Sequence, residues 1–283
     1  MNNSAMNFTT FAVSTNSIAQ SSGILGNVKF SVHCINFLFG LPAHSYVIWL
    51  IITGTGSGVA SGFFILNLSV CEIANCLNSL FTVLDNISRF SSVTLLTYFL
   101  VGLAITGRPL FQCLMCVERY LAVVHPVTFL KLRPLRYRVI CCTVVWLFSF
   151  CSCLCCIFTF VLLNFYIYAC INSVQFLVLF SIQLFCLVAV LRALKQSGPG
   201  ERGRDREEEN PMKRKAFYLI LITTMSTMMI YMPFTVSGFV YMLTQHNFDD
   251  PLSVGIVCFI LGGFVQPVLY LHRAGKPSCL CSP

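Results

Sequence analysis

Long apolar segments alternate with short polar ones along the whole chain. Each apolar segment has about 20 residues or more, the length that an α-helix needs to cross the hydrocarbon core of a bilayer. Seven such segments follow one another, and we therefore predict seven transmembrane helices. They are Val28–Thr53, Val59–Leu84, Val93–Val123, Val139–Leu163, Ile171–Leu194, Ala216–Leu243 and Leu252–Leu271.

The composition agrees with this prediction. Of the 283 residues, 57% are hydrophobic and only 10% are charged, whereas soluble domains carry about 25% charged residues. Seven apolar segments in succession and this low charge argue against the alternative, a soluble protein with buried helices. We predict an all-α membrane protein, a seven-helix bundle in the lipid bilayer over residues 28–272. Residues 1–27 form a polar tail before it, and residues 273–283 form a short tail after it.

Basic residues gather on one side of the predicted bundle. Most of the 18 lysines and arginines lie between segments three and four, between five and six, or after seven. Loops rich in Lys and Arg stay in the cytoplasm, so we expect an extracellular N-terminus and a cytosolic C-terminus. The net charge of +8 reflects this face and requires no nucleic-acid partner.

Two sites of covalent modification are expected in the tails. Asn2 and Asn7 begin Asn-x-Ser/Thr patterns in the extracellular tail, which predicts glycosylation there. Cys279 and Cys281 follow the last span and are candidates for palmitoylation, with free thiols as the alternative. Most of the 16 cysteines lie inside spans, where Cys acts as a small apolar residue. No metal site or disulfide framework is predicted from them.

Charged residues inside the spans are costly and therefore informative. Arg108 lies three helical turns before Arg119, about 16 Å deeper, and Glu72 lies about 20 Å into the second span. A lone charge at that depth costs at least about 2.5–3.5 kcal/mol. We therefore expect Glu72 and Arg108 to form an internal salt bridge. In the alternative, Arg108 points away from Glu72 and binds backbone carbonyl groups.

Short motifs in five of the segments, together with Pro126 after the third, resemble those of the rhodopsin-like (class A) G-protein-coupled receptors. Their order and spacing make the resemblance specific, and it covers all seven spans. Gly40-Leu41-Pro42 and the residues after Glu118 favour purinergic-like or protease-activated-like receptors. The matching motifs are Asn67–Glu72, Glu118-Arg119-Tyr120, Pro126, Trp146, Tyr231-Met232-Pro233-Phe234 and Gln266-Pro267-Val268-Leu269-Tyr270.

The resemblance implies a switch around Arg119. In the family, Glu118 pairs with Arg119 in the inactive bundle, and activation breaks that pair while helix 6 swings outward. The opened cleft then accepts a helix of a heterotrimeric G protein. Val127, after Pro126, stands where the family places an apolar contact to the G protein, and Tyr270 would swing inward.

Prolines provide the expected hinges of this switch. Pro233 follows Tyr231, the residue at the position of the toggle in helix 6, and Pro267 lies in helix 7. Pro109, beside Arg108, is expected to disturb helix 3. These residues imply a plasma-membrane receptor that transmits an extracellular signal through helices 6 and 7.

Several positions depart from the family pattern. Thr94 replaces the cysteine that normally pairs with a residue such as Cys170, and the second outer loop is reduced to about Asn164–Cys170. His44 and Gln266 stand where the family has Asn. The expected salt bridge would also occupy the space in which the family binds sodium.

Lys213 departs from the family as well. Some receptors carry an acid at this position that locks helix 6 to the arginine of helix 3. A lysine repels Arg119, so we expect some signalling without ligand.

The ligand is only broadly indicated. Apolar residues fill the positions where the family carries charges for amines or phosphates, which favours a small apolar or lipid-like ligand. The candidate contacts are Tyr98, Val101, Gln175, Tyr231 and Tyr241.

Other functions remain open at this stage. A chemosensory receptor, a non-signalling decoy and, more remotely, an ion transporter are the alternatives. No cofactor is implied, and the five scattered histidines form no catalytic set with an acid or a nucleophile, which argues against an enzyme.

Overall fold

A computed structural model describes residues 25–54, 59–88, 94–132, 134–161, 165–196, 206–244 and 249–274. Within these ranges the regular structure is helical, and the prediction of seven membrane-spanning helices is confirmed. Each observed span lies within a few residues of the predicted one. The spans are Leu25–Ile52, Gly62–Ile87, Thr94–Val124, Leu135–Thr159, Cys170–Ala193, Phe217–Ser237 and Ser253–His272.

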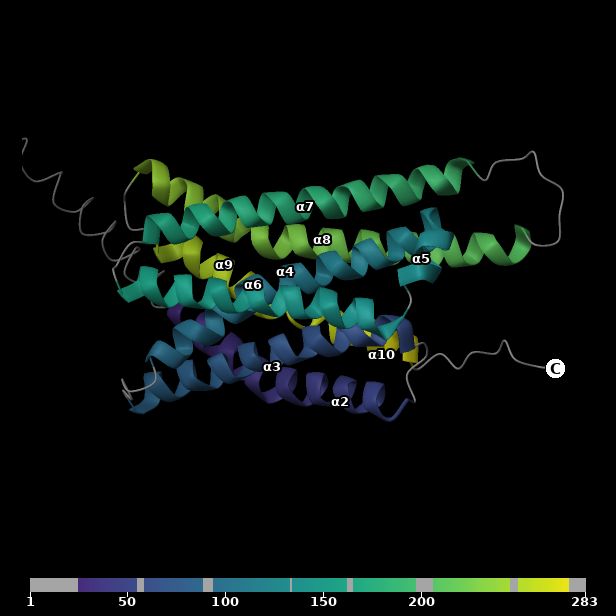
Figure 1. Cartoon of the computed structure of the whole chain (residues 1–283). Coiled ribbons are helices and arrows are strands. Elements are labelled where there is room, and N and C mark those ends of the chain that lie inside the picture. The colour runs from purple at the N-terminus through teal and green to yellow at the C-terminus, as the bar shows by residue number, and fades with distance from the viewer. Residues whose placement is uncertain are drawn as a thin grey trace, which may run out of the picture.

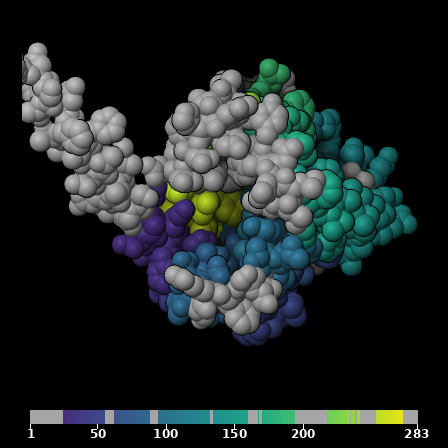
Figure 2. Space-filling view, turned by 90° about the vertical axis from the view of Figure 1, so that its left-hand side faces the viewer, coloured from purple at the N-terminus to yellow at the C-terminus, as the bar shows by residue number. Residues whose placement is uncertain are grey.

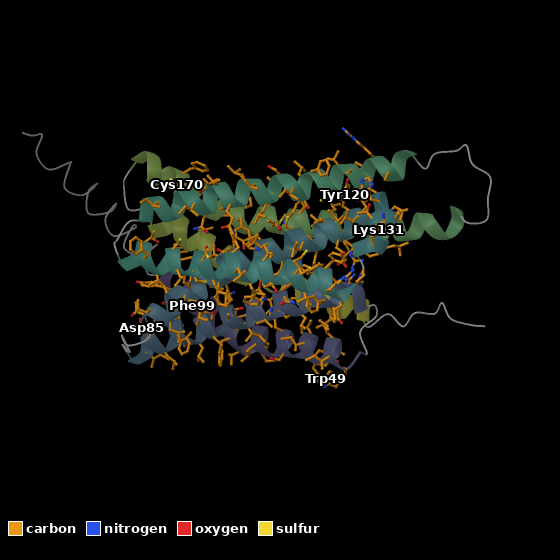
Figure 3. The ribbon with its side chains drawn as sticks, in the orientation of Figure 1. Trp49, Asp85, Phe99, Tyr120, Lys131 and Cys170 are labelled. Carbon is orange, nitrogen blue, oxygen red and sulfur yellow. The ribbon has the colours of Figure 1, made fainter. Side chains whose placement is uncertain are left out.

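The helices form one elongated bundle (Figure 1). Its two ends are distinguished by labelled side chains in Figure 3. Asp85 and Cys170 lie at one end, called the Cys170 end from here on. Tyr120 and Lys131 lie at the other, called the α5 end because it carries the short helix α5, Pro126–Leu132.

Helix α4, Thr94–Val124, lies at the centre of the bundle (Figure 1). It packs against α3 (Val59–Ser88), α6 (Leu135–Val161), α7 (Phe165–Gln196) and α8 (Arg206–Thr244). Small residues allow this close packing. A Cβ at Gly102 would lie 3.1 Å from the Cys153 Cα, and one at Gly107 would lie 2.8 Å from the Cys71 sulfur. The helix continues through Pro109, where we had expected a disturbance.

The first span changes its helical winding in the middle. Residues Asn36–Gly40 form a π-helix, η1, and α2 follows from Leu41 to Ile52. Pro42, which has no N–H to donate, stands in the first turn of α2. Gly40 fits only because it has no side chain, since a Cβ there would lie 2.9 Å from the Asn36 Oδ1 and 3.0 Å from the Cys76 sulfur.

The last span is broken into α9, Asp249–Gly262, and α10, Val265–Ala274. At the turn between them, the Gly263 N–H donates to the Ile260 carbonyl at 3.0 Å, three residues back, rather than to the Phe259 carbonyl. Pro267, where we had expected a kink, removes one donor from the start of α10. The break therefore lies one turn before the proline.

Three boundaries differ from the sequence prediction. Helix α5 was not predicted, although Pro126 at its first position is typical of helix starts. Helix α6 begins at Leu135, four residues earlier than expected. Helix α8 begins at Arg206, ten residues before the predicted span Ala216–Leu243, where Glu207–Glu209 favour a helix N-terminus.

The bundle interior consists of apolar clusters, and its outer face is apolar as well. One cluster joins Ile105, Phe176, Tyr231 and Phe259 from four helices. Seen from the Cys170 end, α9 lies between the first span and the α3–α4 pair (Figure 2). Many large apolar side chains point outward, as expected for contact with lipid. Examples are Phe39, Ile52, Leu147, Leu154, Phe185 and Met229.

Candidate functional site

Glu72 of α3 and Arg108 of α4 meet in the middle of the bundle, as the depth argument predicted. The two side chains form a two-pronged contact: Nε donates to Oε1, and Nη2 donates to Oε2 at 2.5 Å. Arg108 is 1% exposed and Glu72 is 2% exposed. Planar, two-pronged pairing is the strongest geometry that a guanidinium and a carboxylate adopt. The two charges therefore neutralise each other in the buried centre of the bundle.

Helix α9 contacts the part of the Arg108 guanidinium that Glu72 leaves free. Nη1 of Arg108 donates to the Phe259 carbonyl, and its Cζ lies 4.1 Å from the centre of the Phe259 ring. That carbonyl is available because the turn after α9 withdraws its helical donor, the Gly263 N–H. Arg108 thus binds a backbone carbonyl in addition to Glu72, and the alternative in which it points away from Glu72 is wrong. Sequence reasoning missed Phe259, because no motif marks a freed carbonyl.

Gly263 lets the broken helix approach this ion pair. A Cβ at this position would lie 3.0 Å from Oε2 of Glu72 and 3.2 Å from Nη2 of Arg108. Tyr231 packs on the Cys170 side of the pair, where its hydroxyl donates to the Ile105 carbonyl at 3.3 Å. His44 is also buried close by, and its Nδ1 has no hydrogen-bond partner.

A second site lies at the α5 end, around Arg119. A pocket with about 480 Å³ of empty space, its open mouth included, is lined by α3, α4, α8 and α10. Arg119, Tyr270, Gln266 and Thr223 supply its polar groups. The structure therefore brings together Arg119 and Tyr270, two predicted switch residues that are far apart in sequence.

Glu118 has a partner that the sequence did not suggest. Its Oε1 accepts a hydrogen bond from Nη2 of Arg138 in α6 at 2.7 Å. Glu118 is 8% exposed and Arg138 is 7% exposed. Oε2 of Glu118 is buried without a hydrogen-bond partner. The pair with Arg119 that the resemblance implies stays a prediction about one state of the switch.

The other predicted coupling residues frame the corner between α4 and α5. The Tyr120 hydroxyl lies 3.1 Å from Nε2 of His125, and its ring packs edge-on against Phe185 of α7. Pro126 begins α5. Val127 follows it and is 68% exposed, so its apolar side chain is accessible from outside the bundle.

The predicted ligand contacts lie on α4, α7 and α8. Tyr231 is buried between the Phe176 ring, at 5.7 Å, and the Phe259 ring, at 6.0 Å. Val101 packs against the same cluster. Tyr98 and Gln175 are half-buried. Pro233, the predicted hinge, lies within continuous α8.

Several predicted residues lie outside the described part of the chain. Asn2, Asn7, Cys279 and Cys281 belong to this group, and the side chains of Tyr241 and Lys213 do as well. Among the described cysteines, all fourteen are free thiols, Cys170 included. Within the same part of the chain no three His, Cys, Asp or Glu side chains are grouped to hold a metal ion.

The sequence profile of the seven-transmembrane receptors of the rhodopsin family matches residues 44–270. Seven spans, the Glu-Arg-Tyr motif at the α5 end and this match agree, and the chain belongs to that family of receptors. It is a multi-pass protein of the plasma membrane.

Individual receptors are similar to the chain at low identity. Human C-C chemokine receptor type 8 is 25% identical over an alignment of 250 residues, gaps included, that covers 78% of this chain and 66% of that receptor. The human uracil nucleotide/cysteinyl leukotriene receptor is 26% identical over an alignment of 300 residues, gaps included, that covers 95% of this chain and 79% of the receptor. Human proteinase-activated receptor 3 is 25% identical over 122 residues, 41% of this chain and 32% of the receptor. The chain thus spans just under two thirds of the chemokine receptor.

Proposed function

We propose that this protein is a G-protein-coupled receptor that passes an extracellular signal to heterotrimeric G proteins. The signal moves α8 and α10 around Arg119 and opens the α5 end of the bundle. A helix of the Gα subunit then enters between the helices, by the mode in which an amphipathic helix lies in a groove.

The pocket beside Arg119 is the observation that carries this proposal. It is bounded by α4, α8 and α10, the helices whose separation would enlarge it. Its arginine supplies a permanent positive charge for carbonyl groups at the end of an entering helix. The exposed Val127 side chain on α5 offers an apolar contact next to the mouth.

The charge distribution supports an orientation with the α5 end in the cytosol. Lys131, Arg136 and Arg192 are exposed at this end, and basic residues near span ends favour the cytoplasmic side. The N-terminus is then extracellular, and a ligand reaches the bundle from the Cys170 end.

The ligand that we propose is small and apolar. The region between Val101 and Tyr231 is packed with Phe176 and Phe259, and Arg108 beneath it is neutralised by Glu72. The names of the relatives cover a chemokine, a nucleotide, a leukotriene and a proteinase. These chemistries differ too much to select a ligand by similarity.

A G-protein recruitment panel without added ligand tests the proposal. Wild type and Arg119→Ala are expressed at matched surface levels, and the recruitment of each main Gα class is measured. We expect recruitment of at least one class by the wild type and a strong loss in Arg119→Ala.

An exposed arginine provides the matched control. Arg192→Ala removes one positive charge from α7 and should leave recruitment unchanged. A wild type that recruits no Gα class, even when Gα is tethered to raise its effective concentration, contradicts the proposal and favours a non-signalling decoy.

A further inference from the structure

Arg138 and Arg119 lie near the same carboxylate but on different sides of α4. Consecutive residues of an α-helix are about 100° apart around its axis, so Glu118 and Arg119 point in different directions. Arg119 lines the pocket between α4, α8 and α10. Glu118 instead reaches α6, where Arg138 donates to its Oε1 at 2.7 Å. The acid and the arginine of one motif therefore face different neighbours.

The Glu118 carboxylate is held at one oxygen only. Oε1 binds Arg138, and Oε2 is buried with no hydrogen-bond partner. Both Arg138 and Arg119 act electrostatically on this carboxylate. A buried carboxylate with a free oxygen and two cations nearby has two competing arrangements, one with each guanidinium.

We propose that Arg138 is a positioning residue for the switch: it holds Glu118 toward α6 and so keeps it from clasping Arg119. This inference rests on the proposed coupling function. With Arg138 in place, the Arg119 guanidinium stays in the pocket that receives Gα. Without it, the carboxylate would turn to Arg119, the other cation that acts on it, because an unpaired buried charge is strongly disfavoured. Arg138 thus sets how easily the receptor couples.

The test uses the full-length receptor in lipid nanodiscs, with the Gα subunit tethered to its C-terminus. Tethering raises the effective concentration of Gα, so docking is measured by energy transfer without any ligand. Arg138→Gln should reduce docking about fivefold, within the range of ordinary allosteric coupling. Arg136→Gln is the matched control, because Arg136 is exposed two residues earlier on α6 and contacts the Tyr137 ring. Docking by this control should equal that of the wild type.

A second pair of variants separates positioning from damage to the fold. In a Glu118→Gln background no carboxylate remains to clasp Arg119, so adding Arg138→Gln should cause no further loss of docking. Arg138→Lys, which retains the charge, should recover most of the wild-type signal. Loss of docking in the double variant equal to that in Arg138→Gln would show a merely structural role and overturn the inference.

The outcomes also separate this inference from the proposed function. If the wild type docks Gα and Arg119→Ala does not, but Arg138→Gln docks as well as the wild type, only the role of Arg138 is wrong. If the wild type itself docks no Gα, the proposed function fails, and the role of Arg138 fails with it.

Discussion

Two buried glutamate–arginine pairs join α4 to its neighbours, and they differ in how completely their polar atoms are used. At Glu72–Arg108 both carboxylate oxygens bind the guanidinium, whose third nitrogen binds the Phe259 carbonyl. At Glu118–Arg138 one carboxylate oxygen has no partner. The pairs lie ten residues apart along α4, about 15 Å.

The difference indicates which pair is fixed and which one can rearrange. A two-pronged pair with an additional carbonyl and an aromatic face has no equally good alternative within reach. A pair held at one oxygen and close to a second arginine does have one. We interpret Glu72–Arg108, called the deep pair from here on, as the rigid centre of the bundle. Glu118–Arg138, at the α5 end, is then the pair that can rearrange.

The largest expected effect comes from breaking the deep pair on one side. Glu72→Gln or Arg108→Met alone leaves an unpaired buried charge and should cost about 3–5 kcal/mol of stability. The double variant Glu72→Leu/Arg108→Met leaves no charge and should lie within about 2 kcal/mol of the wild type. Thermal unfolding of the purified protein in nanodiscs measures each loss. Two single losses that simply add in the double variant would show that the pair is not coupled.

The next largest effect is expected from Gly263→Ala. The added Cβ would lie 3.0 Å from Oε2 of Glu72, so the turn or the ion pair has to shift, at a cost of about 1–3 kcal/mol. Gly26→Ala is the control, since a Cβ at that exposed position meets nothing within 4 Å. Thermal unfolding again gives the comparison. Equal stability of the two variants would mean that the turn does not hold the pair.

Glu118→Gln should have a smaller effect on stability than Glu72→Gln. The neutral side chain still accepts a hydrogen bond from Arg138, which is 7% exposed whereas Arg108 is 1% exposed, so we expect a loss of about 1–2 kcal/mol. G-protein recruitment should rise at the same time, because no carboxylate is left to bind Arg119. A loss of stability as large as that of Glu72→Gln would erase the distinction between the two pairs.

The smallest effect is expected from sodium. An ion bound at 100 times its dissociation constant would stabilise the protein by about 2.7 kcal/mol. Here the Arg108 guanidinium occupies the carboxylate, so replacing sodium chloride by choline chloride at constant ionic strength should leave the unfolding temperature unchanged. A higher unfolding temperature in sodium would contradict the closed pair.

Much of the fold follows from the sequence, because span length and hydropathy determine the helices. The prediction Val93–Val123 differs from α4 by one residue at each end. The Glu72–Arg108 contact was also predictable, since two opposite charges at equal depth in a membrane require each other.

The partner of Glu118 was not predictable from the same pattern. Hydropathy placed Arg138 in a loop, because the fourth span was expected to start at Val139. In the structure α6 starts at Leu135, which puts Arg138 inside the helix at the level of Glu118. An error of one helical turn was therefore enough to hide the partner. The break before α10 was missed for a related reason, since prolines mark helix disturbances only to within a turn.

The turn at Gly263 has a mechanical consequence. Arg108 binds the Phe259 carbonyl of α9, on the Cys170 side of the break, so α9 is tied to α4 while α10 is not held by that bond. In the proposed switch, Tyr270 would turn with α10 about the Gly263 turn, while α9 stays tied to α4. Arg108 would thus fix the point in the bundle interior about which α10 turns relative to α9.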